Sequence, residues 1–280
     1  MAENKLFVVA TPIGNLADIS QRAIDVLASV DLIAAEDTRH SSRLLGHLGI
    51  RKPLWAVHDH NESQAAQGLV NKLKEGLSIA LVSDAGTPLI ADPGFHVLKA
   101  IVEAGFEVVP VPGPCAVITA LCASALPTDR FIFDGFLPAK QQARQQYFSE
   151  HKEQDRTLVV YESTHRIVDS LQDMQQVLGA EREIVLGREL TKTFETFIRG
   201  NIAEVRAKVE ADHNQQKGEF VVMIRGYQKP EGEQIPAEVM NTLRILAEEL
   251  PLKKAAALAA KLTGYKKNQL YQAGLDEKDA

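Results

Sequence analysis

The chain of 280 residues has only two cysteines, Cys115 and Cys122, which lie too far apart to form the close pair typical of structural zinc sites. Two cysteines also do not indicate the disulfide framework of a small secreted domain, so a reducing, cytoplasmic compartment is expected. The N-terminus lacks a basic region followed by a long apolar run, and no signal peptide is predicted. The longest apolar stretch, residues 108–126, is interrupted by three prolines and does not predict a membrane span.

An excess of positive charge is also missing. The chain has 31 Lys and Arg residues against 37 Asp and Glu residues, a formal net charge of −6, which argues against a protein covered in positive charge for nucleic acid. A local basic patch is still compatible with this balance. His58 and His60 flank Asp59, but no third ligand with suitable spacing follows, so we interpret this segment as a polar loop and expect no metal.

Short apolar runs alternate with amphipathic stretches in the first half of the chain. They predict strands at residues 6–10, 32–35, 54–57, 78–82 and 107–111, with helices between them. Continuous apolar strands in strand–helix alternation imply a mainly parallel sheet covered on both faces. Ligands bind beyond the carboxyl ends of such strands. The loops that should converge at this edge are residues 11–15, 36–39, 83–94 and 112–115.

A break at residues 126–129 separates a second group of elements. Its predicted strands are close together with few helices between them, which indicates a mixed sheet in a second α/β domain; they are residues 130–136, 157–161, 183–186, 193–199 and 219–225. Residues 228–235 are predicted to be a polar linker, followed by helices at 236–250, 253–263 and 267–273. The predicted fold is therefore α/β, with domains at 1–126 and 127–227 and a helical module within 228–280.

The loop at residues 83–94 (SDAGTPLIADPG) is the most informative motif. Gly86 and Gly94 allow close backbone approach or positive φ, and two prolines stiffen the loop. Such a loop can present backbone groups to an adenosine and a carboxylate to its ribose hydroxyls. A stiff loop in which Asp84 and Asp92 act only as local caps stays open on composition alone. The first turn, TPIGN, lacks the glycine spacing of dinucleotide-binding and P-loop sites, which disfavours a nucleotide hydrolase.

Five phrases, in their order and spacing, resemble the ribosomal RNA small subunit methyltransferase I family: ATPIGNLADIS, AAEDTRHS, LVSDAGTPLIADPG, VVPVPGPCAVITAL and VVYESTHR. This family belongs to the tetrapyrrole methylase-like (class III) methyltransferases. The resemblance runs from about Leu6 to Arg225, and the last helices resemble the family's C-terminal extension. It implies two α/β domains of the tetrapyrrole methylase type with S-adenosylmethionine (AdoMet) in the cleft between them. It also implies a homodimer that methylates the ribose 2′-hydroxyl of a cytidine in the decoding region of small-subunit (16S) rRNA.

The same resemblance implies cofactor-binding residues on loops of both domains. They are Pro12, Ser83, Asp84, Ala85, Gly86, Thr87, Leu89, Cys115 and Ala116 in the first domain, and Tyr161, Glu162, Leu190 and Thr191 in the second. Tetrapyrrole methylases usually show a GxGPG-like first loop and a GDP-like second one, where this chain has TPIGN and SDAGTP. These departures favour rRNA over a porphyrinoid substrate.

A ribose hydroxyl is a weak nucleophile, so a general base would assist its methylation. The candidates whose segments should border the cleft are Glu36, Asp37, Glu162 and Lys192. Each is also plausible as a partner in a structural ion pair, and Glu36 and Asp37 facing Arg39 form the most obvious one.

Two groups of basic residues suit contact with RNA phosphates. The first comprises Arg39, His40, Arg43 and Arg166, each of which is also typical of an ordinary solvated helix face. The second lies in residues 251–270, which contain no acidic residue and five lysines: Lys253, Lys254, Lys261, Lys266 and Lys267. Three short helices with this charge resemble a helix-turn-helix-like nucleic-acid module, and a solvated helical cap is the alternative.

Small-subunit rRNA, free or in the assembled small ribosomal subunit, is therefore the expected partner. Two other functions stay open. One is a small-molecule methyltransferase of the tetrapyrrole type, which the lysine-rich tail and the altered loops disfavour. The other is an RNA-binding protein that senses AdoMet without catalysis.

Overall fold

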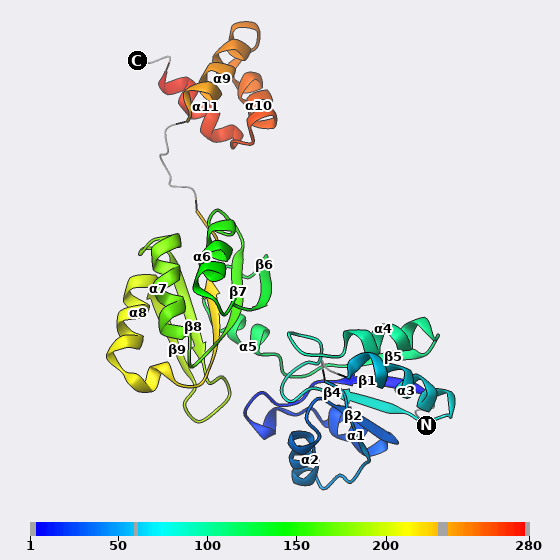
Figure 1. Cartoon of the computed structure of the whole chain (residues 1–280). Coiled ribbons are helices and arrows are strands. Elements are labelled where there is room, and N and C mark those ends of the chain that lie inside the picture. The colour runs from blue at the N-terminus through cyan, green and yellow to red at the C-terminus, as the bar shows by residue number, and fades with distance from the viewer. Residues whose placement is uncertain (1–3, 59–60, 229–234, 278–280) are drawn as a thin grey trace. The chain divides into compact units, whose positions relative to one another are not determined.

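The computed structural model describes residues 4–58, 61–228 and 235–277 (Figure 1). The chain forms two compact units, Met1–Tyr227 and Gln228–Ala280. The first unit contains two five-stranded sheets, and the second contains helices α9 to α11. Most of the predicted linker, residues 229–234, lies outside the described residues.

The first sheet has the strand order β3-β2-β4-β1-β5, and all its described pairs are parallel. Its strands are β1 (Lys5–Val9), β2 (Leu32–Ala35), β3 (Leu54–Ala56), β4 (Ile79–Val82) and β5 (Glu107–Val111). The helices of this half are η1 (Leu16–Asp18), α1 (Gln21–Ser29), α2 (Thr38–His47), α3 (Glu62–Lys74) and α4 (Phe95–Glu103). The predicted parallel sheet is confirmed.

Apolar side chains alternate between the two faces of this sheet, as successive residues of a strand must. Leu6 packs on one face with Leu69 of α3 and Ile101 of α4. Phe7 packs on the opposite face with Leu27 of α1. The helix α1 begins where the Ser20 hydroxyl accepts a hydrogen bond from the Ala23 N–H at 3.1 Å, the usual role of serine at a helix N-cap.

The second sheet has the strand order β6-β7-β10-β8-β9. Its strands are β6 (Phe131–Phe136), β7 (Thr157–Ser163), β8 (Glu183–Arg188), β9 (Thr196–Asn201) and β10 (Glu219–Ile224). The β6–β7 pair is parallel and the other pairs are antiparallel, so the sheet is mixed as predicted. One face packs against α6 (Gln141–Glu150), α7 (Ile167–Leu178) and α8 (Ile202–Ala211), and the other against α5 (Ala116–Cys122).

Two elements of this half differ from the prediction. Helix α8 was not predicted, although Asn201 and Glu204 form a reciprocal capping box at its start, a signature that can be read from sequence. The strand predicted from residue 193 begins only at Thr196. The Phe194 carbonyl accepts hydrogen bonds from the Arg188 guanidinium and the Thr196 hydroxyl, which fixes it in a loop.

The C-terminal unit is a three-helix module of α9 (Ala237–Glu249), α10 (Leu252–Thr263) and α11 (Lys267–Asp276). Its small core combines leucine and alanine side chains: Leu243, Ala255, Ala256, Ala259 and Leu270. The turn at Gly264 separates α10 from α11. No helix among the described residues is long and apolar enough to cross a membrane.

Candidate active site

A cavity of about 300 Å³ lies between loops that follow strands of the first sheet and the strands β7 and β10 of the second. This volume is at the lower end of the range for small-molecule sites. Its walls are mainly apolar or made of small residues, with acidic groups at a few points. The lining residues are Ile13, Ala85, Gly86, Thr87, Ile90, Asp92, Cys115, Ala116, Phe136, Tyr161, Glu162, Ser163, Leu190, Glu219, Phe220 and Val221.

The loop at residues 83–94 is tied to the first turn by a two-residue antiparallel bridge. The Thr11 N–H donates to the Gly86 carbonyl at 2.8 Å, and the Gly86 N–H donates to the Thr11 carbonyl at 3.0 Å. Gly86 has φ +80°, and a Cβ there would lie 3.2 Å from Ile13 Cγ2. Glycine is therefore needed at this point of the cavity wall, because any side chain would be strained and crowded.

Both ends of the remaining loop are also anchored. The Thr87 hydroxyl donates to the Pro114 carbonyl at 2.9 Å. At the other end, the buried carboxylate of Glu62 accepts hydrogen bonds from the N–H groups of Gly94 and His96, at 3.1 and 2.5 Å. Glu62 thereby caps the N-terminus of α4, which has no side-chain cap of its own and attracts negative charge.

The backbone between these anchors is strained. Leu89 has φ +72° and Ala91 has φ +66°, conformations that cost non-glycine residues about 1–3 kcal/mol each. Glu189 and Thr191, in the loop that follows β8, also have positive φ values of 49° and 64°. Strain on two loops beside one cavity is typical of functional sites.

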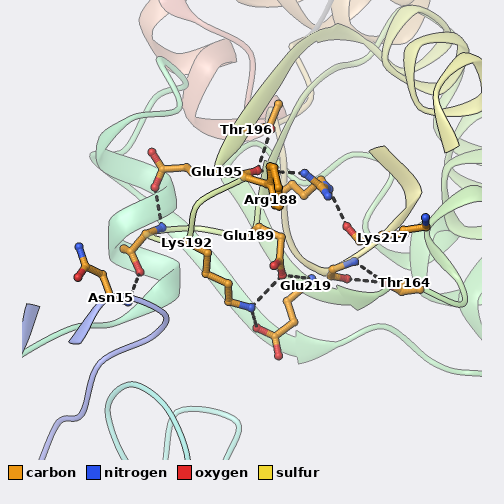
Figure 2. A network of polar contacts seen from close by, with 12 residues as sticks. Asn15, Thr164, Arg188, Glu189, Lys192, Glu195, Thr196, Lys217 and Glu219 are labelled. Carbon is orange, nitrogen blue, oxygen red and sulfur yellow. Dashed lines mark hydrogen bonds and ion pairs between the residues drawn. The ribbon is translucent and has the colours of Figure 1, made fainter. Parts of the chain in front are cut away.

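The loop after β8 is held by a polar network (Figure 2). Lys192 Nζ lies 2.8 Å from Glu189 Oε1 and 3.0 Å from Glu219 Oε2. The Thr191 N–H donates to Glu195 Oε2 at 2.6 Å. This network orients Leu190, whose side chain belongs to the apolar wall.

The same loop contacts the first turn directly. The Asn15 N–H donates to the Thr191 hydroxyl at 3.1 Å. A Cβ on Gly14 would clash with the Lys192 side chain and lie 2.9 Å from Thr191 Oγ1. Glycine at position 14 therefore lets the two loops that border the cavity approach each other closely.

The predicted cofactor residues divide into two groups. Those that line the cavity are Ala85, Gly86, Thr87, Cys115, Ala116, Tyr161, Glu162 and Leu190. Those that adjoin it without lining it are Pro12, Ser83, Asp84, Leu89 and Thr191. Asp84, for example, accepts a hydrogen bond from the Asp37 N–H at 3.0 Å, which connects the loop to the start of α2.

Several lining residues are not among the predicted cofactor residues: Ile13, Ile90, Asp92, Phe136, Ser163, Glu219, Phe220 and Val221. Ile13, Ile90 and Asp92 lie inside the motifs already singled out. Val221 pairs with Tyr161 across the antiparallel β7–β10 ladder. That pairing, which brings β10 to the cavity, has no signal in the sequence.

Glu162 lines the cavity, but its carboxylate belongs to the opposite face of the second sheet. Oε1 accepts from Arg166 Nη2 at 2.8 Å and from the Ser163 N–H at 2.7 Å, and Oε2 accepts from the Ser170 hydroxyl at 2.5 Å. Its side chain is fully buried. Neighbouring residues of a strand face opposite sides, so Tyr161 faces the cavity while the Glu162 carboxylate holds α7.

The other candidate bases do not line the cavity. Asp37 caps α2 and binds Arg39 Nη2 at 2.7 Å, and hydrogen bonds from Arg39 lower the pKa of Asp37 well below its usual range. Glu36 Oε2 lies 3.5 Å from the Asp84 N–H. Burial alone would lower the pKa of Lys192, but its bonds to Glu189 and Glu219 outweigh burial and raise it. Lys192 therefore stays a cation at neutral pH and is unsuited to accept a proton.

The predicted RNA-contact residues are mostly exposed. Arg39, His40 and Arg43 lie on α2 with exposed side chains, 87% for Arg39. Arg166 is instead engaged with Glu162. The five lysines of residues 251–270 are exposed on α10 or near the start of α11: Lys253, Lys254, Lys261, Lys266 and Lys267.

The residues of the cavity fit AdoMet. Small residues such as Gly86 and Ala116 leave backbone groups accessible, and Ile13 and Leu190 offer apolar surface. Asp59 and His60, part of the segment weighed as a metal site, lie outside the described residues. Within the described parts of the chain, no group of three or more His, Cys, Asp or Glu side chains could hold a metal ion.

Comparisons with known proteins identify the family of the chain. Residues 5–206 match the family described as "Tetrapyrrole (Corrin/Porphyrin) Methylases", and residues 233–278 match the "RsmI C-terminal HTH domain". Ribosomal RNA small subunit methyltransferase I of Haemophilus influenzae is 59% identical over 96% of this chain and 96% of its own length. The protein of the same name from Pseudomonas aeruginosa is 55% identical over 98% of each chain.

Solved structures are similar in fold at low sequence identity. A diphthine synthase superposes with a TM-score of 0.59 at 12% identity, covering 79% of this chain and 90% of that one. The methyltransferase CobJ superposes with a TM-score of 0.58 at 16% identity, covering 79% and 93%. Both likenesses concern the fold alone.

Proposed function

The chain belongs to the ribosomal RNA small subunit methyltransferase I family, within the tetrapyrrole methylases, and on this premise we propose its reaction and substrate. It is an AdoMet-dependent rRNA methyltransferase. We propose that it methylates the ribose 2′-hydroxyl of a cytidine in the decoding region of 16S rRNA. The observation that carries this proposal is the cavity, most of whose lining residues lie in four of the five phrases that carry the family resemblance.

AdoMet bound in this cavity supplies an electrophilic methyl group for an in-line displacement. The chain's own residues then serve mainly to bind and orient. The loop at 83–94 and the loop after β8 are both tied to the first turn, through the Thr11–Gly86 bridge and the hydrogen bond from Asn15 to Thr191. Alignment of this kind can lower a barrier by several kcal/mol. In this proposal residues 1–126 provide the cofactor loops and residues 127–227 the second wall.

RNA contacts are assigned to exposed cations outside the cavity. Arg39 and Arg43 of α2 supply charge in the first unit. The tail lysines supply it in the helical module of residues 228–280, for which the match to a helix-turn-helix domain supports a role in binding nucleic acid. The chain's negative net charge makes these patches, rather than the whole surface, the expected contact sites.

An aromatic residue at the cavity supports a nucleotide as the substrate. Phe136 is exposed and lies with its ring centroid 5.3 Å from that of Tyr161. Unpaired RNA bases commonly stack on such rings. We expect Phe136→Ala to raise KM for the RNA with little change in AdoMet affinity, and an unchanged KM would contradict the stacking role.

The test of the reaction is transfer of a radiolabelled methyl group from AdoMet. Small ribosomal subunits that lack the modification and protein-free rRNA are the two RNA substrates, and a porphyrinoid is the control. Label in RNA supports the proposal and shows which form is recognised. Label in the porphyrinoid alone would instead favour the tetrapyrrole type. AdoMet binding without any transfer would favour a sensor protein.

The family also suggests a homodimer that works in the cytoplasm. Sedimentation of the full-length protein would report the oligomeric state, and a monomer at enzyme-assay concentrations would contradict the dimer. Fractionation of cells that express the tagged chain would test the compartment.

A further inference from the structure

Among the described residues, three carboxylates line the cavity: Asp92, Glu162 and Glu219. The Glu162 carboxylate cannot reach a substrate in the cavity, because it is bonded to Arg166, Ser163 and Ser170 on the far face of the sheet. The Glu219 carboxylate lies at the rim, with 83% of its side chain exposed, and is paired with Lys192. Asp92 is the carboxylate left to act on a substrate inside the cavity.

Asp92 differs from the other two in its surroundings. It is half-buried, and no ion pair joins it to a cation among the described residues. Burial raises its pKa, the Ser83 hydroxyl opposes this with a hydrogen bond, and the charge of Asp84 adds to the rise. A carboxylate without a cationic partner and with a raised pKa is a better proton acceptor than an ordinary aspartate.

The loop holds Asp92 in place from both sides. The strained Ala91 precedes it, and two residues later the Gly94 N–H is fixed by Glu62. Thr87 ties the other limb of the loop to Pro114. An anchored backbone limits the positions that this side chain can take, as a catalytic group requires.

The titratable groups that face Asp92 around the cavity are Asp84 of the same loop, Cys115 before α5, Tyr161 of β7 and Glu219 of β10. Burial, followed by the charges of Cys115 and Asp92, raises the pKa of Tyr161. Tyr161 therefore remains a neutral phenol, so it does not compete with Asp92 for a proton. None of these neighbours is a cation.

We propose that Asp92 is the general base, accepting the proton of the ribose hydroxyl as that oxygen is methylated. This rests on the proposed function. The bond between the ribose oxygen and the methyl carbon forms while the bond between that carbon and the sulfonium sulfur breaks. The sulfur leaves as a neutral thioether, and the hydroxyl proton ends on an Asp92 carboxylate oxygen. Charge and atoms balance without a further reactant.

The test compares the wild-type protein with Asp92→Asn, Asp92→Glu and, as a matched control, Asp25→Asn at an exposed site of α1 outside the cavity. Asp92→Asn should lower kcat by about 10²–10⁴-fold, the usual contribution of a general base. AdoMet affinity measured by calorimetry and KM for the RNA should change less than about threefold. Asp92→Glu should recover part of the rate, and the control should match wild type.

Two measurements separate a base from a structural role. The acid limb of the wild-type pH–rate profile should follow a group with a pKa above the ordinary aspartate value of about 3.9, and the limb should move in Asp92→Glu. In the ligand-free protein, carbon-13 NMR of labelled aspartates should show one carboxyl that titrates above that value and is missing in Asp92→Asn.

Several results would overturn the assignment. An unchanged kcat in Asp92→Asn would do so. A loss of AdoMet affinity of tenfold or more at unchanged kcat would show that Asp92 holds the cofactor instead. A wild-type protein that methylates no RNA would overturn the proposed function and the role of Asp92 with it. An active wild type with an equally active Asp92→Asn would overturn the role of Asp92 alone.

Discussion

The substitution Glu162→Gln distinguishes a structural carboxylate from a catalytic one. The amide keeps the shape of the side chain and can still accept from Arg166 and Ser163 through Oε1. It removes the negative charge that faces Arg166 and places an N–H₂ group against the Ser170 hydroxyl. The variant therefore weakens the contacts that hold α7 to β7 and leaves the cavity wall, which faces the other way, intact.

The size of the effect follows from burial. Removing one partner of a buried ion pair costs about 3–5 kcal/mol of stability. Because 25% of the Arg166 side chain is exposed, water can solvate the unpaired guanidinium and reduce this cost. Since the carboxylate acceptor is replaced by a neutral amide while Arg166 keeps its charge, we expect a loss of about 2–3 kcal/mol. For a unit of this size that corresponds to a fall in Tm of about 4–12 °C.

The assay pairs thermal unfolding with methyl transfer at 25 °C. Because folded domains retain about 5–15 kcal/mol of stability, the variant should remain folded at that temperature and keep kcat within about threefold. Glu183→Gln is the matched control, because Glu183 forms an ion pair with Arg225 in which both side chains are partly exposed. This substitution should lower the free energy of unfolding by less than about 1 kcal/mol. An unchanged Tm with kcat lowered a hundredfold would refute the structural reading of Glu162.

Three further predictions concern the loops and the tail. Gly14→Ala should weaken AdoMet binding at least tenfold in calorimetry, because its Cβ pushes the first turn away from Thr191 and Lys192. The control Gly46→Ala has open space in α2, so it should leave AdoMet affinity unchanged and raise stability by about 0.5–1 kcal/mol. Equal AdoMet affinities in the two variants would contradict the loop contact. Glu62→Ala should lower stability by about 1–3 kcal/mol through the uncapped α4 and weaken AdoMet binding, and a stable variant with normal affinity would contradict the capping role. The double change Lys266→Glu and Lys267→Glu should reduce the slope of log affinity for RNA against log salt by about 2 at unchanged AdoMet affinity, and an unchanged slope would remove these lysines from the interface.

The sequence could predict the first sheet because its strands are short, apolar and separated by helices. Ala34 and Ala80, for example, sit in continuous buried runs that only a sheet covered on both faces accommodates. The mixed second sheet was predictable from the crowding of its strands. Helix α8 was not predicted because it has few periodic apolar residues, namely Ile202, Val205 and Val209.

The site was predictable to the extent that it lies in contiguous phrases. The glycines and prolines of residues 83–94 predict a rigid ligand-binding loop, and the family resemblance implies that its ligand is AdoMet. The phrase alone does not show the face of the strand on which each side chain lies. Glu162 and Tyr161 are neighbours, but their side chains lie on opposite faces of β7. The sequence also does not reveal that Glu219, far along the chain, pairs with Lys192 at the rim. Such contacts depend on strand pairing between distant segments.

The most direct test of the central claim is nucleoside mass spectrometry of 16S rRNA from small subunits incubated with the protein and AdoMet. The subunits come from cells that lack the modification, and a reaction without AdoMet is the control. The account predicts up to one equivalent of 2′-O-methylcytidine per subunit, located in the decoding region. A methyl group on a base, on another nucleoside or nowhere in the RNA would contradict it.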